Sequence, residues 1–284
     1  MSGRGARVIA RTLWASGLTS VARWIVAARG RFVIELHGVP RRVYAEIPPA
    51  MRPSLSEADL VKILAWLSRR FHFLSPLEFL ETDRPGILLT FDDGFANNHD
   101  VVVPLLEKFG APAIFFVTTQ HLGTNGRWLP SAVDAARAGW GEPNEVPSDV
   151  ARDVFDGMDE NQIRACAATG LVTIGAHAVS HPKRTTLDDD ELEREITLSK
   201  EMMEEVSGVP VDLFAYPFGD ADERVARAVA AAGFRAAFVE ERLPIEPVYL
   251  GIPRVGLHSA MPWYLATKLS GLHDRPLAGA VFSS

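Results

Sequence analysis

The sequence predicts an α/β fold, a closed or nearly closed (β/α) barrel with about seven parallel strands. Short apolar runs alternate with helical patterns through most of the 284 residues, and this alternation is typical of parallel βαβ units. Seven or eight of the runs qualify as strands, which suits a closed or nearly closed barrel better than an open sheet. The functional site of such a barrel lies at the C-terminal ends of its strands.

Each element has its own local signal. Apolar runs bounded by glycine and proline predict the strands, which in chain order are 32–36, 71–74, 87–91, 113–117, 171–175, 213–216, 234–239 and 252–257. Helical spacing of apolar residues predicts the helices, with capping residues such as Ser56 before them and glycines such as Gly208 after them. In chain order these helices are 56–67, a short one from 76, 99–109, 159–168, 187–207, 222–232 and a closing one from 262.

The strand at 87–91 ends in an unusual way. Its apolar run is bounded by Gly86 and Gly94, which predicts a strand buried on both faces. It ends in Asp92 and Asp93, and carboxylates at the rim of a core are costly unless a cation or a metal pairs with them. We therefore expect these two residues to hold a metal ion and a proton at the C-terminal end of a barrel strand.

Composition limits the classes of function. The chain is 47% hydrophobic and 23% charged, as in an ordinary globular protein, and its formal charge of −7 argues against a general nucleic-acid partner. The single cysteine, Cys166, excludes an intrachain disulfide and a cysteine-only metal cluster. It is compatible with a reducing compartment, so we expect a cytoplasmic protein, with membrane association as an open option. The sequence does not predict an oligomeric state.

Residues 1–31 differ from the rest of the chain, which we expect to form one barrel domain over 32–284. They carry six arginines and no acid, and their apolar residues have roughly helical spacing. We expect a basic amphipathic helix that packs on the barrel. A peripheral contact with an anionic membrane surface and a cleaved export signal are the alternatives.

Three of the expected strand ends carry side chains suited to chemistry. Besides the pair Asp92 and Asp93, His177 and His181 follow the strand at 171–175, and the segment 216–219 (Tyr-Pro-Phe-Gly) follows the strand at 213–216. Two histidines and one carboxylate leave a coordination position open for water, as in a catalytic zinc site. The second carboxylate can then act as the base.

These motifs, in this order, resemble those of the polysaccharide deacetylases, carbohydrate esterases built on the chitooligosaccharide deacetylase homology domain. The matching segments are 90–94 (Thr-Phe-Asp-Asp-Gly), 177–181 (His-Ala-Val-Ser-His), 214–219 (Phe-Ala-Tyr-Pro-Phe-Gly), 114–117 (Ile-Phe-Phe-Val) and 253–254 (Pro-Arg). The resemblance spans roughly residues 32–271. It implies a deformed (β/α) barrel that removes an acetyl group from an N-acetylated sugar or from a surface polysaccharide or glycolipid intermediate.

The resemblance also implies a role for each motif residue. Asp92 would be the general base. Asp93, His177 and His181 would bind a divalent metal, with zinc expected first, although two histidines and a carboxylate also admit cobalt or nickel.

Further roles are implied for residues later in the chain. Tyr216 would lend its backbone N–H to the oxyanion hole, and Arg254 would keep the base ionised and oriented. His258 would be the general acid. His37, in an element where leucine replaces the usual tyrosine, is the other candidate histidine.

The chain departs from the family pattern at two further places. Ala178 stands where a serine or threonine hydroxyl often supports the metal site, and the arginine that often begins the third motif is missing from the segment 212–214. The loop-rich segment 118–150 is the expected site of substrate specificity. Trp128, Trp140, Trp263 and Tyr264 are candidate sugar-stacking rings or core residues. A metal-dependent amide hydrolase acting on a non-sugar substrate, or a non-catalytic carbohydrate-binding member of the fold, are the alternative functions.

Overall fold

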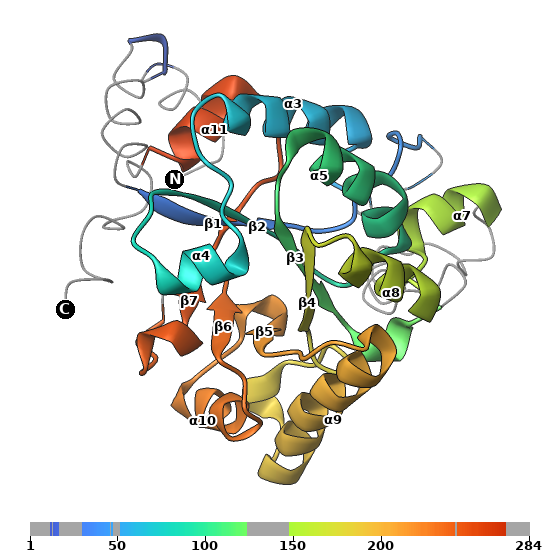
Figure 1. Cartoon of the computed structure of the whole chain (residues 1–284), viewed down its shortest axis with the longest axis vertical. Coiled ribbons are helices and arrows are strands. Elements are labelled where there is room, and N and C mark those ends of the chain that lie inside the picture. The colour runs from blue at the N-terminus through green and yellow to red at the C-terminus, as the bar shows by residue number, and fades with distance from the viewer. Residues whose placement is uncertain are drawn as a thin grey trace.

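The computed structural model describes residues 12, 14–16, 30–45, 47, 52–123, 148–241 and 243–270. Over these residues one sheet of eight parallel strands curls into a nearly closed barrel with helices around its outside (Figure 1), in the order β7-β6-β5-β4-β3-β2-β1-β8. The strands are β1 (Arg31–Leu36), β2 (Gly86–Phe91), β3 (Ala113–Val117), β4 (Val172–Ala176), β5 (Leu213–Ala215), β6 (Ala236–Val239), β7 (Ile252–Pro253) and β8 (Val255–Gly256). The predicted deformed (β/α) barrel is confirmed.

One short stretch of chain brings the two edges of the sheet together. β7 pairs with β6 and β8 pairs with β1, and only Arg254 separates β7 from β8. The N–H of Arg254 donates to the carbonyl of Val239 at 3.0 Å, and the N–H of Leu257 donates to the carbonyl of Glu35 at 3.1 Å. The single strand predicted at 252–257 is therefore two strands, which raises the count from about seven to eight.

The strand predicted at 71–74 makes only one bridge, between Phe73 and Ile87. β3 pairs with β2 only from Leu89 onward, so the backbone groups of Ile87 are left for this segment. The N–H of Ile87 donates to the carbonyl of His72, and its carbonyl accepts from the N–H of Leu74, both at 2.8 Å. The segment is a short extension beside the sheet and not one of its strands.

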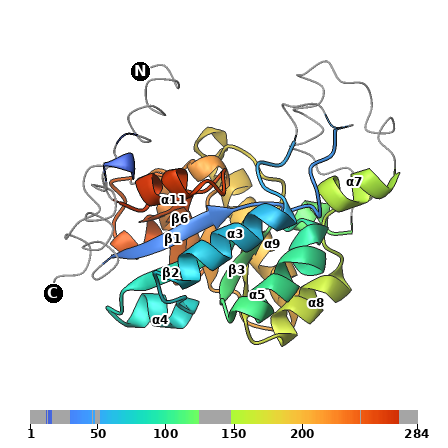
Figure 2. The same cartoon turned by 90° about the horizontal axis from the view of Figure 1, so that it is seen from above.

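Helices follow the strands around the outside, and Figure 2 shows α3, α5 and α8 along one flank. Asp59, Gln162 and Glu191 complete capping boxes at the starts of three of them. In chain order the helices are α3 (Glu57–Ser68), α4 (Pro76–Glu81), η1 (Asn98–Val102), α5 (Val103–Phe109), η2 (Thr119–His121), α7 (Ser148–Phe155), α8 (Glu160–Ala168), η4 (Arg184–Thr186), α9 (Asp189–Ser207), η5 (Pro217–Gly219), α10 (Glu223–Ala231), η6 (Val248–Leu250) and α11 (Pro262–Lys268). Among the described residues, none of the helices combines the length and apolar content needed to cross a membrane.

Side chains inside the barrel form a separate core cluster. Residues from six strands meet there, among them Leu88, Phe116 and Phe238, whereas Leu89 and Phe91 of β2 belong to the larger cluster that also contains residues of the surrounding helices. Alternate residues of a strand point to opposite faces. The series that begins at Leu88 therefore points inward, and its position along β2 decides which carboxylate enters the barrel.

Of the expected N-terminal helix, only Thr12, Trp14, Ala15 and Ser16 are among the described residues, and the first three are helical. The rest of residues 1–29 lies outside them. The boundary at residue 31 and the membrane-surface contact therefore stay predictions.

Candidate metal centre and active site

Asp92 and Asp93 follow β2 but occupy different places. Asp92 continues the inward-facing series of Leu88 and Thr90 and is 2% exposed, while Asp93 is 5% exposed. The backbone turns at this point, because Asp93 and Gly94 have φ angles of 79° and 80°. Left-handed backbone is costly for an aspartate and marks strain at a functional position. The turn lets two adjacent carboxylates serve two separate groups of partners.

His177 lies directly after β4, and its ring is oriented by a backbone group. Its Nδ1 lies 2.9 Å from the carbonyl oxygen of Ala215 at the end of β5. A carbonyl can only accept, so Nδ1 carries the proton, and in the neutral ring the lone pair of Nε2 is available to a metal. The ring of His181 lies 4.9 Å away, centroid to centroid.

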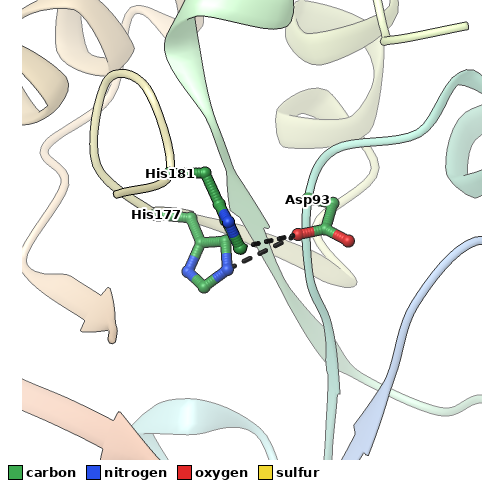
Figure 3. A group of neighbouring side chains, drawn as sticks. All are labelled: Asp93, His177 and His181. Atoms are coloured by element: carbon green, nitrogen blue, oxygen red, sulfur yellow. Dashed lines mark ion pairs between the residues drawn. The ribbon is translucent and has the colours of Figure 1, made fainter. Parts of the chain in front are cut away.

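The three expected metal ligands converge on one point (Figure 3). Oδ1 of Asp93 lies 3.5 Å from Nε2 of His177 and 3.5 Å from Nε2 of His181. Ligand atoms at zinc distances in a tetrahedral site lie about 3.3 Å apart, close to these values. Oδ1 of Asp93 is buried and receives no hydrogen bond from the described residues. The donor set and its spacing therefore fit a divalent cation.

Asp92 is held by Arg254, the residue at the closure of the barrel. Two guanidinium nitrogens donate to its two carboxylate oxygens, each at 2.7 Å. The guanidinium also lies 3.4 Å from Oε2 of Glu35. Burial opposes ionisation of Asp92, but the charge of Arg254 and its hydrogen bonds outweigh it, and the pKa of Asp92 is lowered to about 2. The structure thus places Arg254 as the sequence predicted.

His37 and His258 lie in the same part of the site. A ring nitrogen of His37 lies within 4.8 Å of carboxylate oxygens of Glu35 and Asp92. Desolvation opposes protonation of His37, but the charge of Asp93 and then those of the other two carboxylates outweigh it and raise its pKa. Desolvation and the charge of His37 instead lower the pKa of His258. Among the described residues His37 belongs to a group of converging ligand atoms that includes Asp92, whereas His258 belongs to no such group.

The prediction for Tyr216 is wrong. Its N–H donates to the carbonyl of Phe238 at 3.0 Å, because the pairing of β5 with β6 continues one residue past the strand. Its hydroxyl donates to the carbonyl of Leu250 at 3.0 Å. Both donors are therefore committed to the barrel, and neither is available to a substrate oxygen.

Two further residues beside the site had no role predicted from the sequence. Phe218 is 52% exposed, its φ is 59°, and its ring lies 4.5 Å from that of His181. Glu35 is buried beside Arg254. A lone carboxylate in the apolar run of β1 was the signal that could have identified it, since such a charge needs a partner.

The candidate sugar-stacking rings are only partly accounted for. Trp128, Trp140 and most of the segment 118–150 lie outside the described residues. Trp263 and Tyr264 lie on α11 with ring centroids 6.1 Å apart. The N–H of His258 donates to the Tyr264 hydroxyl at 3.3 Å, so this tyrosine supports the loop that carries His258.

Several known proteins resemble this chain in sequence. A family model described as "Polysaccharide deacetylase" matches residues 80–237. The protein named "Putative polysaccharide deacetylase YxkH" from Bacillus subtilis (strain 168) is 20% identical over 213 residues, which is 69% of this chain and 65% of that protein. A gellan lyase from Bacillus sp is 29% identical over 146 residues, 51% of this chain and 4% of that protein. The chain thus spans less than two thirds of the length of these curated relatives.

Two solved structures share the fold. IcaB from Ammonifex degensii superposes with a TM-score of 0.63 at 20% identity, covering 85% of this chain and 97% of that one. PplD from Streptococcus pyogenes, solved in complex with acetate, gives 0.59 at 16% identity, covering 80% and 91%. Because the family model matches more than half of the sequence, the chain belongs to the polysaccharide deacetylase family.

Proposed function

We propose that this protein is a metal-dependent hydrolase that removes acetyl groups from an N-acetylated sugar, on a surface polysaccharide or a glycolipid intermediate. The observation that carries the proposal is the convergence of Asp93, His177 and His181, 3.5 Å from carboxylate to each imidazole, beside the buried pair of Asp92 and Arg254. Family membership supports deacetylation, and the acetate in the PplD structure is the product expected of such a reaction.

Asp93, His177 and His181 would hold the metal, with zinc proposed first because two histidines and a carboxylate leave a position open. When bound, the metal supplies Lewis acidity at the acetyl carbonyl and the attacking water. Asp92 accepts the proton of that water. A pKa of about 2 keeps Asp92 ionised at neutral pH but makes it a weak base, so its task requires a water that has already been acidified.

The proton that returns to the leaving amine comes from His37 in this proposal. Its ring lies close to Asp92, and its raised pKa favours the protonated form that an acid needs. His258, the earlier candidate, has a lowered pKa, and among the described residues its ring belongs to no group of converging ligand atoms. For the oxyanion, the N–H of Phe218 replaces that of Tyr216, since Phe218 lies on left-handed backbone beside His181.

Acetate release from a panel of N-acetylated oligosaccharides, measured together with metal content, tests the proposal. Asp92→Asn should retain the metal and lose acetate release, whereas His177→Ala should lose the metal. An active Asp92→Asn enzyme would refute the assigned base. Release of formate or ammonia from other amides would indicate a different hydrolase, and sugar binding without turnover by metal-loaded protein would indicate a binding module.

A second pair of variants assigns the acid. His37→Gln should lower kcat by about 10²-fold or more, within the usual contribution of general acid–base catalysis, and His258→Gln should lower it far less. The opposite order would restore His258 as the acid.

A further inference from the structure

The turn that carries both histidines is the most strained part of the site. Between His177 and His181 the chain reverses within five residues, and Ala178 and His181 have φ angles of 62° and 59°. Neither is a glycine, so each costs energy in this conformation. Such a turn persists only where its surroundings hold it in place.

One side of the turn is held by the chain that follows β3. The hydroxyl of Thr118 donates to the carbonyl of His177 at 3.3 Å. The N–H groups of Thr119 and Gln120 donate to the carbonyls of Ala178 and Val179 at 3.2 and 2.9 Å. Three successive carbonyls of the turn are thereby satisfied.

The other side is held by one carboxylate on α9, that of Glu195. Its Oε2 accepts from the N–H groups of Val179 and Ser180 at 3.0 and 2.9 Å. Its Oε1 accepts from the Ser180 hydroxyl at 2.7 Å. Hydrogen bonds to an ionised acceptor are about twice as strong as neutral ones, so this residue is the strongest polar contact of the turn.

Glu195 also supplies hydrogen bonds to a turn that lacks a hydroxyl group at Ala178. That side chain is a fully buried methyl group and cannot support the turn by hydrogen bonding. We infer that Glu195 is the positioning residue of the metal centre: it fixes the turn so that Nε2 of His177 and Nε2 of His181 converge on Asp93. This inference rests on the proposed function, because it requires these three residues to bind a metal.

Metal affinity is the quantity that should respond. Residues that orient metal ligands typically contribute 10- to 100-fold to affinity, so Glu195→Ala should raise the Zn²⁺ dissociation constant by about that factor. Glu195→Gln retains an acceptor oxygen for both N–H groups and should stay within about threefold of the wild type. Glu195→Asp retains the charge but is one methylene shorter, and should fall between the two.

Glu204→Ala is the matched control. Glu204 lies on the same helix, and its Oε1 accepts from the N–H of Val211 at 3.1 Å, remote from the histidines. Glu204→Ala removes a hydrogen bond between a carboxylate of α9 and a backbone N–H, as Glu195→Ala does. We therefore expect Glu204→Ala to lower the stability of the protein without changing its metal affinity.

Competition with a chromophoric chelator gives the dissociation constants, and the visible spectrum of the Co²⁺-loaded protein reports the coordination geometry. The inference predicts weaker binding and an altered Co²⁺ spectrum for Glu195→Ala alone, with recovery in Glu195→Gln. Unchanged affinity in Glu195→Ala, or equal weakening in Glu204→Ala, would overturn it. If Glu195→Ala does not fold, unchanged affinity in Glu195→Asp overturns it equally. A wild-type protein that binds no metal would instead refute the proposed function on which it rests.

Discussion

Replacing Arg254 should destabilise the protein more than replacing Asp92, although the two form one ion pair. Their side chains are 1% and 3% exposed. Glu35 also faces the guanidinium, at 3.4 Å. Loss of Asp92 leaves Arg254 with this second carboxylate, whereas loss of Arg254 leaves two buried carboxylates without their guanidinium partner. Removing one partner of a buried pair costs about 3–5 kcal/mol, and we expect that range for Arg254→Met.

Asp92→Asn retains an acceptor oxygen for the guanidinium and should cost only about 1–2 kcal/mol, close to the net value of a single hydrogen bond. In the double variant, Asp92→Asn with Arg254→Met, only the carboxylate of Glu35 remains of the two that faced the guanidinium. Adding Asp92→Asn to Arg254→Met should therefore increase stability. Urea unfolding at pH 7 with a chelator present measures all three. The reasoning is refuted if Arg254→Met costs no more than Asp92→Asn, or if the second substitution destabilises the first further.

The pH dependence of this effect has a defined sign. In the wild type the pKa of Asp92 is about 2 in the folded state, below its ordinary value of 3.8. The pair's contribution of about 2 kcal/mol is then fully present above pH 3.8 and is lost as the pH falls toward 2. Without Arg254, burial still opposes ionisation of Asp92, and we expect its pKa to rise above the unfolded value. In the variant, the cost of burying ionised Asp92 is then greatest at neutral pH. The difference in the free energy of unfolding between wild type and Arg254→Met should therefore be smaller at pH 4.5 than at pH 7.

Three further predictions concern the surroundings of the site. Gly94→Ala should cost about 2–4 kcal/mol in urea unfolding, since φ is 80° and the new Cβ would lie 2.7 Å from a valine side chain of β3, whereas Gly110→Ala, with φ of 58° in open space, should cost about 1 kcal/mol. Cys166 should resist Ellman's reagent at pH 8 until the protein unfolds, because burial raises the pKa of its thiol to about 12. Asp153→Ala should lower the free energy of unfolding by about 2–3 kcal/mol and Tyr44→Phe by about 1 kcal/mol. The carboxylate of Asp153 accepts from the Tyr44 hydroxyl at 2.7 Å, and from the backbone N–H and the guanidinium of Arg41.

The elements that could be predicted from the sequence are those whose signals are local. The apolar run before Asp92, the capping residues Ser56 and Asp159 and the helix-ending Gly208 each act within a few residues, and the structure has elements there. The spacing of His177 and His181 after a strand is equally local.

Features that depend on pairing between distant segments could not be predicted. Whether 252–257 is one strand or two depends on β6 and β1 both meeting it, which is a property of barrel closure. Whether Tyr216 has a free N–H depends on its register with β6. Its position in a recognised motif said nothing about that register, so the motif was found and the role of its tyrosine was wrong.

The backbone conformation also marks the site, because the described non-glycine residues with positive φ all lie around it. They are Asp93, Ala178, His181 and Phe218, and they follow the C-terminal ends of three strands, β2, β4 and β5. Strain of this kind costs stability and persists only where the surrounding structure holds it in place, most often at functional sites. Here it turns one carboxylate toward two imidazoles, reverses the chain between those imidazoles, and places an exposed ring against one of them. Glu195 holds the turn that carries the two histidines, and Arg254 holds Asp92 beside them. The strained residues and the contacts that stabilise them therefore all surround the proposed metal centre.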